Sequence, residues 1–162
     1  MRTVLIQNHW QAIFSIGSLT VLPFWLLLIL LPKADLTRRV MKSAAVILGP
    51  TLLYAFAVLP HLSEILPPLL KPQLAKIALL LGSPSGATAA WLHFLAFDLF
   101  LGRWIYLDSR ERDISPLLVS PILVLTLLLG PVGFLVYIAI ARFWRPGSTT
   151  PAVVASAADS GS

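Results

Sequence analysis

The stretch Trp91 to Asp113 reads WLHFLAFDLFLGRWIYLDSRERD and decides how the rest of the chain must be arranged. It is apolar enough to form a membrane helix, but it carries His93, Asp98 and Arg103 inside it. A charged side chain near the middle of a membrane-spanning helix costs at least about 2.5 kcal/mol, so such residues usually face a bundle interior or a water-filled cavity. We therefore expect other helices to enclose this segment, and we expect it to carry the chemistry of the protein.

The composition is that of an integral membrane protein. Of the 162 residues 57% are hydrophobic and 12% are charged, whereas soluble domains contain about 25% charged residues. The net charge is +5, but Lys and Arg lie at the ends of apolar runs, where they anchor a helix to lipid headgroups rather than bind nucleic acid. The chain has no cysteine, which excludes a thiolate nucleophile and a cysteine-bound zinc site.

Four stretches are apolar enough to cross a membrane. They are residues 12–31, 43–59, 83–107 and 114–141, and they predict an all-α protein with a four-transmembrane-helix bundle over residues 1–145. Four crossings place both termini on one side. The two loops between helices 1 and 2 and between 3 and 4 carry seven Lys and Arg, counting Arg103, against five on the other side, a weak bias that places both termini outside.

Two segments do not fit a simple helical pattern. Residues 60–82 contain four prolines, which rule out one continuous helix, so this stretch is either an interfacial segment between helices 2 and 3, with a short helix over residues 73–81, or a connecting loop. Residues 146–162 are rich in Ala, Ser, Thr and Pro and have no aromatic residue, which predicts a disordered tail. Glycine–proline pairs at residues 49–50 and 130–131 predict bends, and their shared Leu-Gly-Pro sequence suggests an internal repeat.

The start of the chain suggests direct insertion into a membrane. The first apolar run is too long for a signal-peptide core, and no Arg- and Ser-rich transit peptide precedes it. We expect an integral protein of a bacterial-type plasma membrane or a thylakoid membrane.

The polar residues of the central stretch recur every five positions, at His93, Asp98, Arg103 and Asp108. Each step turns about 140° around a helix, so these residues do not form one stripe and need partners on other helices. Asp98 is either a general acid or base or a structural carboxylate paired with Arg103. His93 is a proton partner, a ligand or a packing residue, and Arg103 either takes part in the chemistry or extends to the interface.

The remaining candidates for a site are aromatic residues, which we expect to contact an apolar substrate: Tyr54, Trp91, Trp104 and Tyr137. The sequence has no histidine-rich di-iron box, no G-x-S-x-G, no P-loop and no dinucleotide fingerprint. We therefore expect no metal and no resident cofactor, and an enzyme of this kind would carry out proton transfer or borrow a cofactor.

Several motifs together resemble a known family. The run LPFWLLLILLPKADLTRRVMKS, an LY-containing span, WLHFLAFDLFLGRWIYLD and LLLGPVGFLVY occur in this order. They are similar to the abscisic-acid-deficient-four-like family of plastid membrane proteins, over about residues 22–142. The most specific parts are the H-x4-D-L-F-x2-R pattern that begins at His93 and the GP-x-G pattern that begins at Gly130.

The resemblance implies a reaction, because plant members of this family are tied to neoxanthin formation. An epoxy-carotenoid is opened and loses a chain proton, which gives an allene and a tertiary alcohol. Carried over to this chain, the motif implies Asp98 or His93 as the base and Arg103 as the group that assists the oxygen. The expected partners are membrane lipid and an apolar polyene or another lipophilic ligand, with homo-oligomerisation left open. The alternatives are a non-enzymatic protein that binds pigment, quinone or lipid, a small subunit that stabilises a membrane complex, and a proton-coupled transporter.

Overall fold

The computed structural model describes residues 2–144, with side chains from residue 8 onward. All regular secondary structure in these residues is helical, so the all-α prediction is confirmed. The predicted disordered tail, residues 146–162, lies outside the described residues, and the division into a domain over residues 1–145 and a tail stays a prediction.

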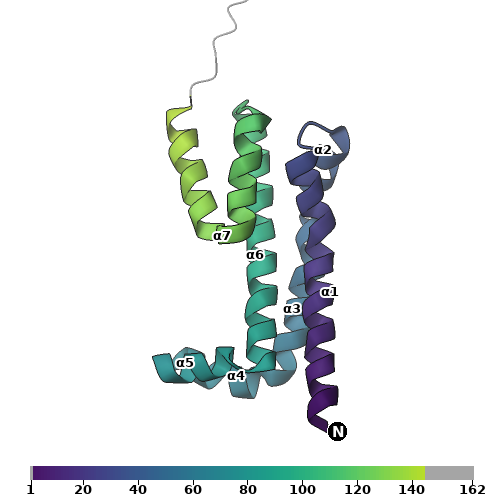
Figure 1. Cartoon of the computed structure of the whole chain (residues 1–162). Coiled ribbons are helices and arrows are strands. Elements are labelled where there is room, and N and C mark those ends of the chain that lie inside the picture. Colours follow the sequence, from purple (N-terminus) through teal and green to yellow (C-terminus); the bar gives the residue numbers. More distant parts are fainter. Residues whose placement is uncertain (1, 145–162) are drawn as a thin grey trace, which may run out of the picture.

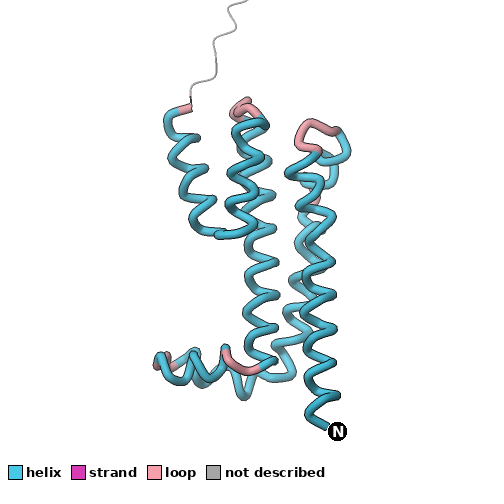
Figure 2. Tube along the Cα trace, viewed as in Figure 1, coloured by secondary structure: helices cyan, strands magenta, loops and turns pink. Residues whose placement is uncertain are grey.

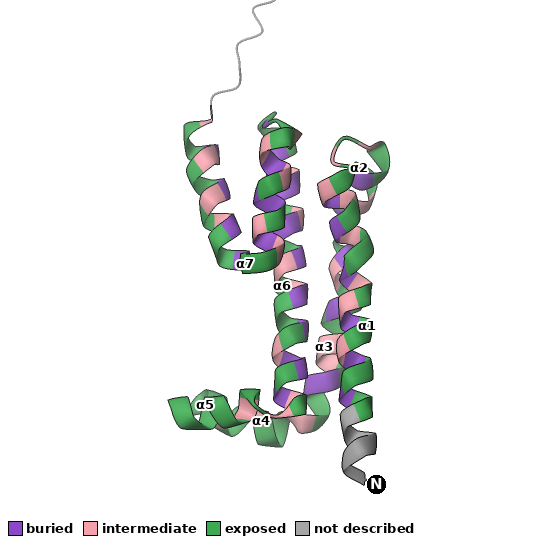
Figure 3. Ribbon diagram, viewed as in Figure 1, coloured by how far each residue is buried: buried purple, intermediate pink, exposed green. Residues whose placement is uncertain are grey.

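Three helices run side by side and form the body of the molecule (Figure 1). Helix α1 covers Arg2–Leu30, α3 covers Leu48–Val58 and α6 covers Pro84–Glu111. With 28 residues, α6 is about 42 Å long, which exceeds a hydrocarbon core of about 30 Å. Their outward faces are exposed while the faces between them are buried (Figure 3). Large apolar side chains cover the exposed faces, Leu19, Leu52 and Phe94 among them, as a lipid-facing surface requires.

Small residues bring α1 and α6 into close contact. A β-carbon at Gly17 would lie 2.2 Å from the Leu92 side chain, and one at Gly102 would lie 2.6 Å from the Trp25 ring. Leu92 and Trp25 are both buried. Close approach between helices at small residues is a common way to pack transmembrane segments, so these contacts fix α6 against α1.

The basic loop between α1 and α3 is an amphipathic helix. Helix α2 covers Asp35–Lys42, and the 3-10 helix η1 covers Ala44–Ile47. On its inner face Thr37 and Met41 are fully buried, and the Thr37 hydroxyl donates a hydrogen bond of 2.7 Å to the Leu31 carbonyl. Its Arg and Lys side chains are exposed at this end of the molecule, where they can reach headgroups.

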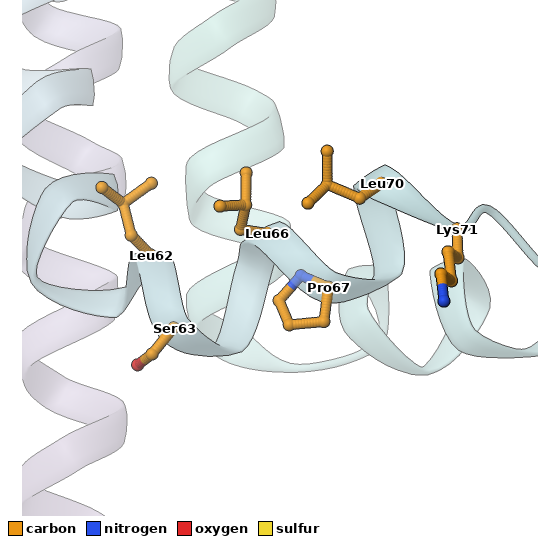
Figure 4. A pocket seen from close by; sticks show the side chains of 6 residues that line it. All are labelled: Leu62, Ser63, Leu66, Pro67, Leu70 and Lys71. Atoms are coloured by element: carbon orange, nitrogen blue, oxygen red, sulfur yellow. The ribbon is translucent and has the colours of Figure 1, made fainter.

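The proline-rich segment forms a helical arm across the opposite end of the bundle (Figure 1). The arm consists of η2 (Leu59–His61), α4 (Leu62–Leu70) and α5 (Leu74–Leu81), and the chain leaves the helical conformation between α4 and α5, beside Pro72. In α4, Leu62 and Leu66 point toward the side on which the bundle rises, while Ser63 points away (Figure 4). A helix with apolar side chains on one face and a polar side chain on the other is typical of a bilayer interface. This amphipathic pattern is consistent with the predicted interfacial position, which stays a prediction.

Helix α7 (Pro116–Phe143) folds back on itself instead of crossing (Figure 2). Leu129 and Gly130 leave the helical conformation, with φ/ψ of −138°/30° and 17°/−84°. The first limb descends beside α6, the chain turns at Gly130, and the second limb returns to the same end (Figure 1). The sequence predicted a bend at this Gly-Pro pair, and the structure has a full reversal.

The structure leaves the predicted count of four crossing helices unconfirmed. By length and apolarity alone, three helical stretches of the described chain are long enough to cross: Asn8–Leu30, Ala44–Leu70 and Pro116–Phe143. The third of these stretches is the α7 hairpin. Helix α6 carries more charge and is not one of the three, but it runs the length of the bundle. The prediction that both termini lie on one side is wrong for the described chain, because the N-terminal end of α1 and the C-terminal end of α7 lie at opposite ends (Figure 1).

Candidate active site

The tip of the α7 hairpin meets Asp98 halfway along α6. A β-carbon at Gly130 would lie 2.2 Å from Asp98 Oδ1, which is far inside the distance that real atoms allow. Gly130 is buried and Asp98 is half-buried, so the carboxylate lies directly against the backbone of the turn. The second limb of α7 begins beside it, and the N-terminal end of a helix carries a partial positive charge that favours a carboxylate.

The second glycine of the GP-x-G pattern closes the hairpin. A β-carbon at Gly133 would lie 2.3 to 2.5 Å from Oγ1, N and Cα of Thr126 on the first limb. Thr126 is fully buried and satisfies its hydroxyl with the Ile122 carbonyl, at 2.8 Å. The two glycines therefore have separate tasks, since one lets the tip approach Asp98 and the other lets the two limbs pack together.

A polar cluster ties the returning limb to the end of α6. The Tyr137 hydroxyl donates a hydrogen bond of 2.5 Å to Asp108 Oδ2, and Arg112 Nε lies 2.7 Å from the same oxygen. Tyr137 is fully buried, and Trp104 packs edge-on against its ring at 5.9 Å. Tyr137 and Trp104 were predicted to bind substrate, and the structure places them together at the α6–α7 contact.

His93 lies on a different side of α6, facing α3. Its ring centroid is 5.6 Å from that of Tyr54, and the ring stacks on Phe97 at 6.1 Å with an interplanar angle of 6°. His93 is exposed and Tyr54 is half-buried. In the described part of the chain, neither side chain takes part in a hydrogen bond within the protein, so both polar groups remain available to a ligand.

Arg103 joins α6 to the end of α2. Its Nε donates a hydrogen bond of 2.7 Å to the Met41 carbonyl, and its terminal nitrogen donates one of 3.1 Å to the Lys42 carbonyl. These carbonyls belong to the last turn of α2, where a helix leaves acceptors unpaired. The predicted catalytic residues are therefore not all together, because Arg103 is held by backbone groups at the α2–η1 junction.

Trp91, the fourth predicted substrate-contacting residue, joins α6 to α1. Its Nε1–H donates a hydrogen bond of 3.0 Å to Ser18 Oγ, and its ring stacks on Phe14 at 5.2 Å. The ring stays partly exposed. The structure thus gives Trp91 a packing role, and its contact with a substrate stays a prediction.

The sequence predicts a bend at Gly130 and places Asp108 in the polar series, but it does not predict their partners, which are Asp98 for Gly130 and Tyr137 for Asp108. Gly130 carried a usable signal, because a Gly-Pro pair inside a long apolar run marks a break in a helix. Asp108 lies in a charged stretch whose side chains read as solvent-exposed. Among residues 8–144, no three His, Asp or Glu side chains gather as a metal-binding set.

Comparison with known proteins agrees with the motifs. The sequence profile described as ABA DEFICIENT 4-like matches residues 12–137. The chain is 32% identical over 111 residues to the protein ABA DEFICIENT 4, chloroplastic, of Arabidopsis thaliana. That alignment covers 65% of this chain and 50% of the relative, so the chain spans about half the length of the curated relative that it matches. No solved structure matches the chain. Because the profile covers most of the sequence, and includes both Asp98 and the hairpin tip, the chain belongs to the ABA DEFICIENT 4-like family.

Proposed function

We propose that this integral membrane protein is an isomerase that opens the epoxide of an epoxy-carotenoid by acid–base chemistry at Asp98. One observation carries the proposal, which is the contact between the Asp98 carboxylate and the reversed tip of α7 at Gly130. A half-buried carboxylate inside a membrane helix is costly unless it has a function or a partner. The contact holds the carboxylate within the bundle, where a proton acceptor can work on an apolar substrate.

The proposed reaction needs no oxidant and no reductant. A base removes one proton from the polyene chain, the electron pair forms the new double bond of an allene, and the epoxide C–O bond breaks. The oxygen keeps that bonding pair and takes up one proton, so the product is a tertiary alcohol of the same formula. Asp98 is the proposed base and His93 the proposed proton donor. Because the two side chains are turned about 140° apart around α6, the substrate would have to reach both sides of that helix.

Arg103 has a different place in this proposal from the one that the motif implied. To assist the oxygen, its guanidinium would have to leave the carbonyls of Met41 and Lys42. We therefore assign it the role of a positioning residue for the α2–η1 junction. Its direct contact with an oxygen stays a prediction of the family motif.

The name of the relative, ABA DEFICIENT 4, chloroplastic, suggests the compartment. We propose that this chain works in a thylakoid or other chloroplast-type membrane, where epoxy-carotenoids dissolve in the bilayer. A binding role without turnover is the second candidate, because an apolar groove passes His93 and Tyr54 on the side of α6 that faces α3.

The test is expression in a host that accumulates violaxanthin-type epoxides, with the pigments separated by chromatography. The wild-type chain should give a new allenic product, and Asp98→Asn should lower its yield at least about a hundredfold, as expected for the loss of a general base. Asp113→Asn is the matched control, because it makes the same chemical change at an exposed turn residue. An unchanged yield from Asp98→Asn at equal protein level would refute the catalytic role of this residue.

A further inference from the structure

A small cavity with two arginines in its walls lies where the returning limb of α7 ends beside α6. Its volume is about 210 Å³. Two residues of α6 and three of α7 line it: Asp108, Arg112, Ile138, Ala141 and Arg142. Asp108 Oδ2 already accepts hydrogen bonds from the Tyr137 hydroxyl and from Arg112 Nε. The proposed isomerase makes no use of the two arginines, so the cavity requires an explanation of its own.

Within the described chain, the two arginines use few of their hydrogen-bond donors. A guanidinium group carries several N–H donors in a planar fork. Among residues 8–144, the Arg112 side chain donates one hydrogen bond, from Nε to Asp108 at 2.7 Å, and the Arg142 side chain forms no hydrogen bond and no ion pair. Glu111 and Asp113, on either side of Arg112, are exposed and do not line the cavity. Two guanidinium groups against one carboxylate leave the cavity with an excess of positive charge.

The cavity lies at the depth of the lipid headgroups. Asp98 is halfway along α6, and from there Asp108 is about 15 Å and Arg112 about 21 Å farther toward the α2 end. A bilayer centred at Asp98 has its hydrocarbon boundary about 15 Å away and its headgroups within about 20 to 22 Å. On the side of the membrane centre the wall is apolar, since Ile138 is 40% exposed and Leu135, one turn closer to the hairpin tip, is 68% exposed. The arginines therefore lie among headgroups, next to a surface that faces acyl chains.

From these features we infer that the cavity binds the phosphate diester of an anionic phospholipid. Arg112 and Arg142 donate charge-assisted hydrogen bonds to the phosphate oxygens, for which the planar guanidinium is well suited. One acyl chain lies along Ile138 and Leu135. Because one arginine belongs to α6 and the other to α7, the bound headgroup joins the two helices at the open end of the hairpin. The inference does not depend on the proposed isomerase activity.

Two phospholipids with the same acyl chains test the inference, dioleoylphosphatidylglycerol and dioleoylphosphatidylcholine, added to the purified full chain in detergent. Native mass spectrometry gives the dissociation constant of the first bound lipid. The wild-type chain should bind phosphatidylglycerol about tenfold more tightly, because the choline cation of the other lipid meets a cavity that is already positive. Arg142→Gln should abolish this preference. Arg39→Gln is the matched control, since it removes the same charge from an exposed arginine of α2 outside the cavity. Equal losses in the two variants would overturn the inference.

A second comparison shows whether the site recognises a lipid or a soluble anion. Inorganic phosphate in excess should leave phosphatidylglycerol bound, because it offers no acyl chain to the apolar wall. Ile138→Ser should weaken binding of phosphatidylglycerol about fivefold, by removing part of that wall. Ile16→Ser, at an exposed position of α1, is the matched control and should leave binding unchanged. Displacement of the lipid by inorganic phosphate, or wild-type affinity in Ile138→Ser, would refute the lipid as the ligand.

Thermal unfolding tests whether the bound headgroup holds the hairpin against α6. A ligand that binds the folded state alone raises the midpoint of unfolding, so the wild-type chain should unfold about 3 °C higher in phosphatidylglycerol than in phosphatidylcholine. Arg142→Gln should unfold at one temperature in both lipids. In phosphatidylcholine it should match the wild type, which shows that the variant folds normally. Equal midpoints of the wild-type chain in the two lipids would overturn the proposed link between the helices.

Discussion

Helices α6 and α7 have the same length but take different paths through the bundle. Each has 28 residues and begins with a proline after a serine, yet α6 runs the length of the bundle while α7 turns back halfway (Figure 1). By apolarity alone α7 is the better candidate to cross, because α6 carries His93, Asp98 and Arg103 whereas α7 has no charged residue before Arg142. Apolarity therefore sets which segments enter the membrane here, and local packing sets which of them cross it.

The polar residues of α6 explain why it can cross. Asp98 meets the hairpin tip, Arg103 is paired with carbonyls of α2, and Asp108 with Tyr137 and Arg112. The hairpin is thus what encloses the central carboxylate. The charged helix and the uncharged hairpin depend on each other, and the predictions below separate them.

The largest expected effect is in a test of membrane topology, in which each cysteine should be labelled from one side of the membrane and not from the other. The chain has no cysteine, so single cysteines can be labelled with a membrane-impermeant maleimide in sealed vesicles. Ser115→Cys and Phe143→Cys flank α7 and should label from the same side, while Gln73→Cys, between α4 and α5, should label from the other. Four crossing helices would instead place residues 115 and 143 on opposite sides.

The same geometry fixes the orientation. The hairpin brings Arg142 to the end that already holds the exposed Arg38 and Arg39 of α2 and Arg110 of α6, while among residues 8–144 only Lys71 and Lys76 carry positive charge at the other end. An excess of Lys and Arg marks the cytoplasmic side. Ser115→Cys should therefore be labelled from the cytoplasmic or stromal side, and labelling from the opposite side would contradict this orientation.

The next largest effect is expected at Gly130. Gly130→Ala places a β-carbon against Asp98 Oδ1, so the tip must move away from α6. We expect a loss of about 1 to 3 kcal/mol in stability, the usual cost of overpacking, together with loss of turnover in the pigment assay. Gly49→Ala is the control, since it makes the same change in a second Leu-Gly-Pro sequence where no atom lies within 4 Å.

A double substitution shows whether the contact is direct. If Gly130→Ala destabilises the protein because its β-carbon clashes with the carboxylate, then Asp98→Ala should restore most of the lost stability in the double variant. The stability changes caused by substitutions at two contacting residues are not additive. Stability is measured by chemical unfolding in detergent. Additive losses would mean that Gly130 acts through the backbone of the turn alone.

The two Leu-Gly-Pro sequences show what the sequence alone could predict. Both were predicted to bend a helix, and the resemblance between them suggested a repeat. In the structure Leu48, Gly49 and Pro50 form the first turn of α3, where proline is well tolerated, whereas the second sequence reverses the chain. The all-helical class, the membrane character and the position of Asp98 on a central helix followed from composition and periodicity.

The reversal did not follow, because it depends on contacts between distant residues. A turn inside a membrane is tolerated only where protein covers its backbone, and here α6 provides that cover at Asp98, 32 positions before Gly130 in the sequence. Arg103 and the carbonyls at 41 and 42 are similarly distant. Residue spacing along one helix gives the direction of each side chain and leaves its partner open.

The smallest effect is expected where the returning limb is fastened to α6. Tyr137→Phe removes the hydrogen bond to Asp108 while keeping the buried ring, and a bond to a charged group contributes about 1.5 to 3 kcal/mol. Tyr106→Phe is the matched control, because it removes a 3.1 Å bond to the neutral Pro32 carbonyl and should cost about 1 kcal/mol. Only Tyr137→Phe should also increase the rate at which maleimide labels Ile140→Cys, a half-buried position on the returning limb, because only this substitution loosens that limb. Equal labelling rates in the two variants would mean that the packing of Trp104 and Phe134, 5.5 Å apart, holds the limb without the polar cluster.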